Sequence, residues 1–464
     1  MLDPSRKFYV PDQVLEVTMA IKANDVPALG YVQYSIDTQK DSHKETADKK
    51  VLENKYYTIE VEENGSLTIV DKANNVTYKN QGILVENGDD GDSFNYSPPR
   101  KDMEVFSNES KCTVKISGSD IYDQAEIHFD MVVPADLDER AEGKVSVTML
   151  VDMTVALRKD SKVIDFNVKV DNKGLSHRLC VLFDSQIVSA FNYADQQFGL
   201  IKRPNYYEKE MKLYMESMNN KTEKKAGIQE LANWANDQST WQEPPISIEP
   251  TQSYVSLTDG KTGIAVIPQG VREYEVLDDS KIRLTLFRTY GFMGKENLIY
   301  RPGRASGERI IEPPAAQLLI EMEFNFGFTS YAGDINDSDI DTLAKQYNTN
   351  LEVYTYAEFL NGRLIFSQRE IEGQNAKIHS LFETEGNLVV SAVKKAEEDD
   401  GYIIRLYNGK DHKDLDDKIK FNFDIKEAYY TNLKEEKTEE IKVENNTISV
   451  KELSHCKFVT IWVK

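Results

Sequence analysis

Alternation of apolar and polar residues over short stretches is the feature that most limits the folds open to this chain. Residues 56–70 (YYTIEVEENGSLTIV) form two alternating runs on either side of Asn64-Gly65, which is a strong β-hairpin signal. The same alternation recurs in 145–157, 163–170, 263–267, 281–287 and 317–328. Turns separate these runs and helical stretches are few. The pattern therefore predicts an all-β protein built around a large antiparallel sandwich.

Three segments interrupt this alternation. Residues 38–50 are polar without periodicity, which predicts a linker or exposed loop. Residues 205–240 predict a long excursion that contains short helices. Residues 336–350 predict a helix that is capped by Asn336 or Asp337.

Strand patterns resume after residue 351 and continue to the end of the chain. The sequence therefore predicts three parts: a β-rich entry segment and linker over 1–48, a large β-supersandwich over 49–345, and a smaller C-terminal β-sandwich over 346–464.

Charge and cysteine content restrict the partners and the compartment. The net charge of −22 argues against nucleic acid or an anionic membrane as the main partner. No apolar run reaches the roughly 20 residues that span a bilayer, and the first residues lack the apolar core of a signal peptide. Three widely spaced cysteines do not suggest a disulfide framework. These features favour a cytoplasmic protein.

Common catalytic motifs are missing from the sequence. It contains no glycine-rich phosphate loop before a helix, no GxSxG, no HExxH and no paired CxxC. His128 and Asp130 would share one face of a strand, so a metal site or an acid–base pair is conceivable. A strand histidine beside an exposed carboxylate is the better interpretation, because no third ligand has comparable spacing.

Two loops could contact a ligand. Residues 86–99 (ENGDDGDSFNYSPP) do not fit the calcium-loop template, and they suit a solvated double turn and a binding loop equally well. In residues 299–309 (IYRPGRASGER), Arg301 and Arg304 flank a Pro-Gly turn. These two guanidinium groups could bind a carboxylate or a hydroxyl-rich ligand, or they could pair with the protein's own aspartates.

Several stretches together resemble the C-terminal β-rich half of glycoside hydrolase family 38, the α-mannosidase family, in its bacterial branch that includes mannosylglycerate hydrolases. These stretches are ENGDDGDSFNYSPP, FNYADQQFGLIKRP, WQEPPISIEPTQSYVSLTDG, YRPGRASGERIIEPPAAQLLIEMEF and LVVSAVKKAEEDDGYIIRLYN. The opening stretches NDVPALGYVQYSID and VLENKYYTIEVEENGSLTIVDKANNVTY also resemble the family's entry into this half.

This resemblance implies a galactose-mutarotase-like supersandwich followed by a smaller β-sandwich. It also implies retaining α-mannoside hydrolysis for the complete enzyme. Family members begin with an α/β barrel that carries the zinc ligands, the aspartate nucleophile and the acid–base aspartate. Nothing in this sequence resembles that metal motif, so we expect the chain alone to bind no metal and to be inactive, with zinc or another divalent cation in the complete enzyme.

The resemblance further implies that loops of the β half line the sugar pocket. The matching residues here are Asp92, Phe94, Tyr96, Arg301 and Arg304, which we expect to contact the substrate. The expected partners are an α-mannoside or other sugar and the missing N-terminal catalytic domain, whose removal should leave an apolar face exposed. The sequence is also compatible with a homo-oligomer.

Two other functions are compatible with the sequence. The chain could be a stand-alone carbohydrate-binding module, which predicts binding of mannosides by the isolated chain. It could also be a mutarotase-like sugar epimerase, which needs a histidine acid and a carboxylate base in one cleft.

Overall fold

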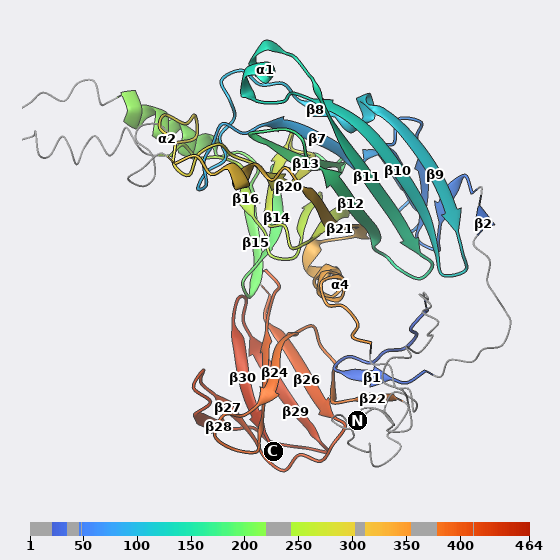
Figure 1. Ribbon diagram of the computed structural model, residues 1–464. Coiled ribbons are helices and arrows are strands. Elements are labelled where there is room, and N and C mark those ends of the chain that lie inside the picture. The colour runs from blue at the N-terminus through green and yellow to red at the C-terminus, as the bar shows by residue number, and fades with distance from the viewer. Residues whose placement is uncertain are drawn as a thin grey trace, which may run out of the picture. The chain divides into compact units, whose positions relative to one another are not determined.

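The computed structural model describes residues 21–34, 46–47, 49–219, 243–301, 311–353, 378–411 and 413–464. The chain forms two compact units. The sandwich unit comprises residues 43–348, and the C-terminal unit comprises residues 349–464 together with 1–42. All the strand pairs of the described residues are antiparallel, so the predicted all-β class is confirmed (Figure 1).

The sandwich unit contains three sheets. The ten-stranded sheet has the order β15 (Gly199–Pro204), β14 (Phe191–Gln196), β17 (Val255–Thr258), β18 (Thr262–Gln269), β21 (Glu321–Ala332), β12 (Ile164–Asp171), β11 (Val147–Arg158), β10 (Tyr122–Val133), β9 (Lys111–Gly118), β2 (Thr46–Ala47). The six-stranded sheet has the order β16 (Glu249–Pro250), β19 (Glu273–Leu277), β20 (Lys281–Arg288), β13 (His177–Asp184), β7 (Ile83–Gly88), β8 (Val105–Phe106). A four-stranded sheet joins β3 (Val51–Glu53), β4 (Tyr57–Val61), β5 (Leu67–Asp71) and β6 (Val76–Gln81).

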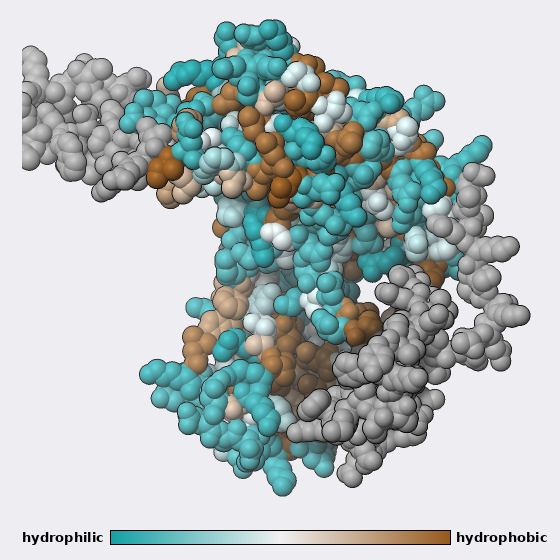
Figure 2. Space-filling view, viewed as in Figure 1, coloured by the Kyte–Doolittle hydropathy of each residue, from teal (hydrophilic) through white to brown (hydrophobic). Residues whose placement is uncertain are grey.

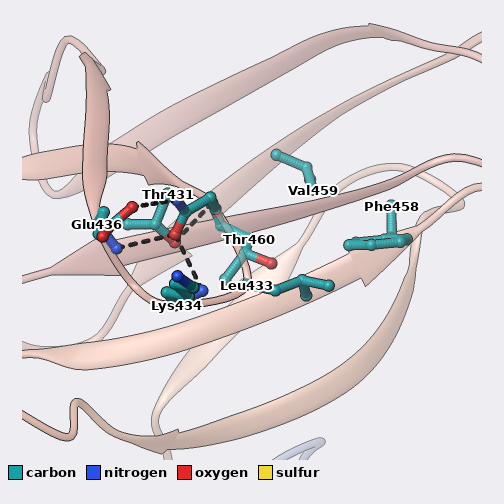
Figure 3. A pocket seen from close by; sticks show the side chains of 8 residues that line it. Thr431, Leu433, Lys434, Glu436, Phe458, Val459 and Thr460 are labelled. Carbon is teal, nitrogen blue, oxygen red and sulfur yellow. Dashed lines mark hydrogen bonds between the residues drawn. The ribbon is translucent and has the colours of Figure 1, made fainter.

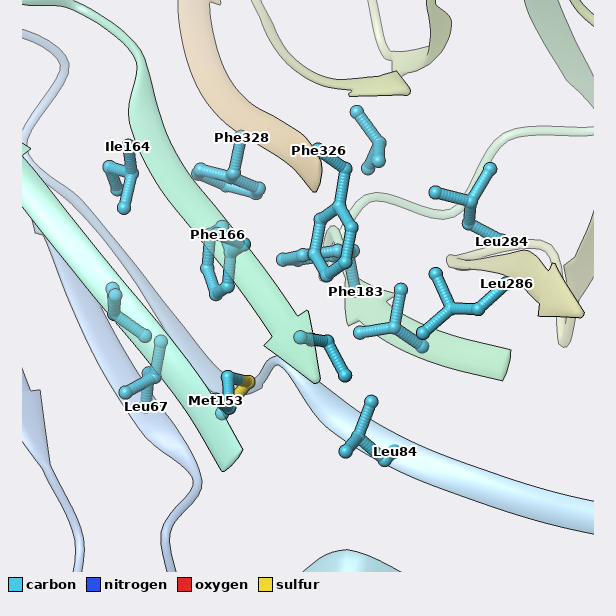
Figure 4. Packing of buried hydrophobic residues seen from close by; sticks show 14 of the residues in the cluster. Leu67, Leu84, Met153, Ile164, Phe166, Phe183, Leu284, Leu286, Phe326 and Phe328 are labelled. Atoms are coloured by element: carbon cyan, nitrogen blue, oxygen red, sulfur yellow. The ribbon is translucent and has the colours of Figure 1, made fainter. Parts of the chain in front are cut away.

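One hydrophobic core holds these three sheets together. Alternate residues of the strands point into it, and four phenylalanines form its aromatic centre (Figure 4). Phe166 stacks on Phe326 with a ring-centroid separation of 5.2 Å, and Phe183 stacks on Phe328 at 5.4 Å. Such offset pairs stabilise a core beyond the area that they bury.

The hairpin predicted at Asn64-Gly65 is confirmed, because β4 and β5 pair in register from Tyr57↔Asp71 to Val61↔Leu67. Gly65 has a φ of +81°, and an added Cβ would lie 2.5 Å from the ring of Phe129 in β10. Glycine is therefore required both by the turn and by the close packing beneath it.

Several expected boundaries are corrected by the structure. The helix expected over 336–350 is α4 (Ile340–Tyr347), and its N-cap is Asp339 rather than Asn336 or Asp337. Those two residues lie in the preceding 3₁₀ turn η5 (Ile335–Asp337), which is capped by the side chain of Asp334. The strand expected over 317–328 begins only at Glu321, after the 3₁₀ turn η4 (Pro314–Gln317).

Short elements complete the sandwich unit. They are η1 (Ser107–Glu109), α1 (Leu137–Glu142) and α2 (Glu208–Asn219). Helix α2 accounts for the start of the excursion expected over 205–240, whose part from 220 onward lies outside the described residues. Most of the expected linker over 38–50 also lies outside them, although β2 pairs with β9.

The C-terminal unit is a smaller sandwich with its own core. A five-stranded sheet has the order β24 (Val389–Lys395), β25 (Tyr402–Tyr407), β30 (Phe458–Val463), β27 (Ala428–Thr431), β28 (Lys437–Glu440). A three-stranded sheet has the order β23 (Phe382–Thr384), β26 (Leu415–Phe421), β29 (Thr447–Leu453). Strand β1 (Gly30–Val32) pairs with β22 (Ile378–Ser380), so this part of the expected entry segment belongs to the C-terminal unit.

The structure gives the state of the three cysteines and the character of the helices in the described residues. Cys112, Cys180 and Cys456 are all free thiols. Across the described ranges, no helix combines the length and the apolar character that crossing a membrane requires.

Candidate functional site

Two loops meet at one end of the six-stranded sheet. Strands β7 and β20 flank β13 and both run antiparallel to it, so their carboxyl ends lie at the same edge. The register places Gly88 opposite His177 and Arg288 opposite Arg178, which are the first two residues of β13. The loop that follows β7 contains residues 89–99, and the loop that follows β20 contains residues 289–301. The topology thus brings residues 86–99 close to the start of the stretch 299–309, whose part from 302 onward lies outside the described residues.

Three acidic residues of the first loop pair with three basic residues at or after the end of β20. Arg288 donates to Asp89 through Nε at 2.6 Å and through Nη2 at 3.1 Å, which is a bidentate pair. Lys295 pairs with Asp90, and Arg301 pairs with Asp92. We call these six residues the loop clamp. They fix the course of both loops relative to the sheet.

Asp92 is the centre of this clamp. Its side chain is 0% exposed, and its carboxylate accepts hydrogen bonds from the backbone N–H groups of Phe94 at 3.0 Å, Asn95 at 3.1 Å and Lys295 at 2.9 Å in addition to Arg301. Burial by itself would raise the pKa of Asp92, but the Arg301 guanidinium and these N–H groups outweigh it and lower the pKa. Asp92 is therefore ionised and fully engaged in holding the loop.

Gly91 lets the chain turn between two members of the clamp. A Cβ at this position would lie 2.0 Å from the backbone oxygen of Asn95 and 2.8 Å from Nη2 of Arg288. Nη2 of Arg288 also donates to the backbone oxygens of Asp92 and Asn95, each at 2.9 Å. The loop folds this tightly around the guanidinium only because residue 91 has no side chain.

Tyr96 turns inward and covers a buried arginine. Its hydroxyl accepts from Nδ2 of Asn87 at 2.9 Å, and the guanidinium carbon of Arg178 lies 3.8 Å from its ring centroid. The ring of Tyr300, from the second loop, meets Tyr96 edge-on at 6.0 Å. Burial raises the pKa of Tyr96, so its hydroxyl stays neutral. Tyr96 joins the two loops through a cation–π contact and an aromatic pair.

Further charged residues lie beneath the loops. Glu86 pairs with Arg140 and accepts from Nδ1 of His177 at 2.9 Å. Glu275 pairs with Nη2 of Arg178 at 2.8 Å and with Nη2 of Arg283 at 2.7 Å. These groups are buried, so the sheet carries a layer of paired charges directly beneath the loops.

Phe94 is the aromatic side chain of this loop that faces solvent, with 64% of its surface exposed. Its neighbour Ser93 donates to the backbone oxygen of Met293 at 2.6 Å, and the N–H of Met293 donates to Ile311 at 2.8 Å. Met293 and Ile311 are each more than 40% exposed. We call these two residues and Phe94 the Phe94 surface. Figure 2 shows apolar atoms exposed among hydrophilic ones on the viewed face of the sandwich unit.

The residues expected to contact a sugar thus occupy different environments. Asp92 is buried and Tyr96 is 7% exposed, whereas Phe94 points outward. Arg301 pairs with the protein's own Asp92, which was the alternative that the sequence left open for it. Arg304 lies outside the described residues. Direct contact of these five residues with a sugar stays a prediction, and the geometry favours Phe94 for that role.

Sequence reasoning did not identify Arg288 or Lys295, although both hold the first loop. The only signal was the run of acidic residues in DDGD (89–92), which requires basic partners if it is buried. With 56 lysines and arginines in the chain, their identity depends on the sheet order.

His128 does not form a metal centre with its neighbours. It lies on β10 with 41% of its side chain exposed, and it contacts Asp152 of β11 at 2.6 Å and Asp130 at 3.3 Å. In the part of the chain that the structure describes, no three His, Cys, Asp or Glu side chains are grouped so that they could hold a metal ion. His177 lies on a different sheet from His128 and is buried.

The fold and the site define a protein of two β-sandwiches with a cluster of paired loops at the carboxyl ends of β7 and β20. The model of the glycosyl hydrolases family 38 C-terminal domain matches residues 52–292, and the model of the glycosyl hydrolases family 38 C-terminal beta sandwich domain matches residues 387–460. The chain therefore belongs to glycosyl hydrolase family 38, of which it contains the C-terminal half.

Individual relatives agree with this assignment. A candidate mannosylglycerate hydrolase of Halalkalibacterium halodurans is 23% identical over 420 residues, which cover 86% of this chain and 40% of that protein. A family 38 glycosyl hydrolase from Enterococcus faecalis superposes with a TM-score of 0.68 at 20% identity, over 92% of this chain and 45% of that one. An alpha-mannosidase from Enterococcus faecalis V583 gives 0.69 at 20% identity, over 91% and 43%. The two structures share the fold, and the chain spans about two fifths of the curated relative's length.

Proposed function

We propose that this chain is the structural and substrate-lining portion of a retaining, metal-dependent α-mannosidase. In this proposal the nucleophile, the acid–base carboxyl group and the zinc or other divalent cation belong to a catalytic barrel outside the chain. Membership of family 38 and the names of the relatives support the substrate class. The three free thiols fit a cytoplasmic enzyme.

The observation that carries this proposal is the loop clamp with Phe94 at its tip. Three ion pairs hold the loop rigid, and the side chain that they leave outside is a phenyl ring. A rigid aromatic face suits the C–H side of a pyranose, and it excludes water from the wall of a pocket. The remainder of the Phe94 surface provides apolar area that a catalytic domain could cover.

The first experiment tests where the activity resides. Hydrolysis of an aryl α-mannoside with added zinc is compared for this chain alone and for the chain extended upstream in its gene. We expect activity only in the extended protein. Hydrolysis by the isolated chain, or none by the extended protein on any α-mannoside, would overturn the proposal.

The second experiment tests the role of Phe94 in the extended enzyme. We expect Phe94→Ala to raise KM for the aryl α-mannoside by about two- to tenfold, because it removes an aromatic contact of roughly 0.5–1.5 kcal/mol. Phe191→Ala is the matched control, since Phe191 is also partly exposed but lies on β14 in the other sheet. Equal KM values for the two variants would remove Phe94 from the substrate wall.

A further inference from the structure

The outer face of the five-stranded sheet in the C-terminal unit carries side chains that its core does not use. Along β30, Val459, Ile461 and Val463 pack into the core, so Phe458, Thr460 and Trp462 lie on the opposite face. The register places Arg405 and Thr431 beside Thr460 on that face. An aromatic side chain, hydroxyl groups and a guanidinium group thus share one sheet surface.

A groove with a volume of about 590 Å³ lies on this face (Figure 3). It is lined by Phe458, Val459 and Thr460 of β30, by Thr431 of β27, and by the turn between β27 and β28, which includes Leu433 and Lys434. The volume is in the range of roughly 300–1,000 Å³ that small-molecule sites occupy. Leu433 is 63% exposed, so the groove is open to solvent.

Further along β30, the aromatic ring of Trp462 is already in contact with other side chains of the protein. Nζ of Lys437 lies 3.1 Å from the ring centroid of Trp462, and Nε1 of Trp462 donates to Asp399 at 2.9 Å. The ring of Phe458 is 38% exposed and lines the groove itself. A ligand on this face would therefore meet Phe458 and not Trp462.

The polar groups around Phe458 can bind hydroxyls. Arg405 uses Nε to donate to Oγ1 of Thr460 at 3.0 Å, and its guanidinium carbon lies 5.9 Å from the Phe458 ring centroid. Within the described residues, the structure gives Nη1 and Nη2 of Arg405 no hydrogen-bond partner. These two donors form a planar fork that fits a pair of oxygen atoms. Lys434 and Glu436 add one charge of each sign at the turn.

We propose that this groove is a binding site for a neutral pyranoside, independent of the function proposed above. The ring of Phe458 takes the C–H face of the sugar, and Arg405, the threonine hydroxyls and the charged pair of the turn bind its hydroxyls. Arg405 and Lys434 carry two positive charges that Glu435 and Glu436 of the turn balance, so an ionic ligand gains little attraction there. A shallow site of this kind gives dissociation constants on the order of 1 mM.

Saturation-transfer NMR on the whole 464-residue chain tests the site, with methyl α-mannopyranoside and methyl β-glucopyranoside as probes at several millimolar. We expect transfer to ring protons of at least one probe. Phe458→Ala should weaken binding about tenfold, and Arg405→Lys, which keeps the charge but loses the fork, should weaken it several-fold. Circular dichroism and the unfolding midpoint check that each variant is folded.

Leu433→Ser adds a variant at an exposed position, where loss of the fold is not expected. It should weaken binding if the groove is the site. Phe191→Ala, on β14 of the sandwich unit, is the control from the other unit and should bind as the unchanged chain does. No transfer to either probe, or unchanged binding by folded Phe458→Ala, would overturn the inference. Loss of binding in Phe94→Ala alone would place the sugar at the Phe94 surface and would likewise overturn it.

Discussion

Asp92 shows how a buried charge can shape a surface. Removing a carboxylate and a guanidinium from water is costly, and such a pair contributes little net stability compared with apolar packing. Asp92 instead fixes the conformation of the loop. Its carboxylate oxygens accept hydrogen bonds from the backbone N–H groups of residues 94, 95 and 295 and from the side chain of Arg301. Together with the other two pairs of the loop clamp, this carboxylate sets the conformation that presents Phe94.

Replacement of Asp92 by asparagine should therefore be costly. It leaves the Arg301 guanidinium buried without a counter-charge, so we expect Asp92→Asn to lower the free energy of unfolding by about 3 kcal/mol. Urea unfolding followed by circular dichroism measures this change. Phe94→Ala, two residues away and exposed, should stay within about 0.5 kcal/mol of the unchanged chain. Similar losses in both variants would contradict the role assigned to Asp92.

Asp92 also makes the free energy of unfolding of the chain decrease at acid pH. Because the folded-state pKa of Asp92 is lowered, its contribution is fully present above the unfolded-state pKa of about 3.9. The contribution is lost as pH falls through the lower, folded-state pKa. The gap in unfolding free energy between the chain and Asp92→Asn should therefore shrink below about pH 4, as urea titrations at several pH values would show.

The pKa of His128 is shifted in the opposite direction, to a higher value than usual. Its hydrogen bond to Asp152 is the main cause that raises its pKa above 6.5, with Asp130 adding to it. A raised pKa means that the ion pairs stabilise the fold below the unfolded-state pKa and are lost as pH rises through the folded-state value. Proton NMR of the His128 ring should show a lower pKa in Asp152→Asn. An unchanged titration would show that the pair does not form in solution.

At the scale of elements, local signals in the sequence predicted local structure well. The Asn64-Gly65 turn and the alternating runs at 145–157 and 163–170 correspond to β4–β5, β11 and β12. The start of α4 was harder to predict, because DINDSDID (334–341) offers an Asp or Asn at five positions and each can cap a turn. Asp334 caps the 3₁₀ turn, and α4 begins only after Asp339.

Pairing between distant elements could not be predicted from such signals. Strand β12 pairs with β21, and β13 lies between β7 and β20, so the partners come from widely separated parts of the chain. The loop clamp depends on this order. The acidic run at 89–92 was visible in the sequence, whereas its basic partners became identifiable only once the sheet edge was known.

The pairing between the two loops can be measured by a double-mutant cycle on Asp90 and Lys295. Both side chains are 28% exposed, so solvent screens the pair and its coupling should be about 0.5–1 kcal/mol. Asp90→Asn and Lys295→Gln should each destabilise the chain slightly, and the double variant should lose less than the sum. Strict additivity in urea unfolding would show that the two loops are not coupled through this pair.

At the scale of the whole molecule, each unit has a core of its own. The clusters around Phe166 and around Tyr254 lie within 43–348, and the cluster around Ile419 lies within the C-terminal unit. A domain that buries its own core can in principle fold alone. No core cluster of the described residues draws on both units.

We therefore expect the fragment 43–348 to fold when it is expressed without the rest of the chain. It should show a β-type circular dichroism spectrum and a single cooperative urea transition, because its three sheets share one hydrophobic core. A broad transition with strong binding of a hydrophobic dye would show that the sandwich unit depends on the C-terminal unit.

The loop clamp also sets an order of events during synthesis. Its pairs join residues that are 199, 205 and 209 positions apart. Closing connections of this length costs entropy before the contacts compensate for it, so such contacts form late. On the ribosome, residues 89–92 emerge about two hundred residues before Arg301, and the nascent chain must keep this acidic segment open until then. The tip that bears Phe94 therefore acquires its shape only after most of the sandwich unit has been translated.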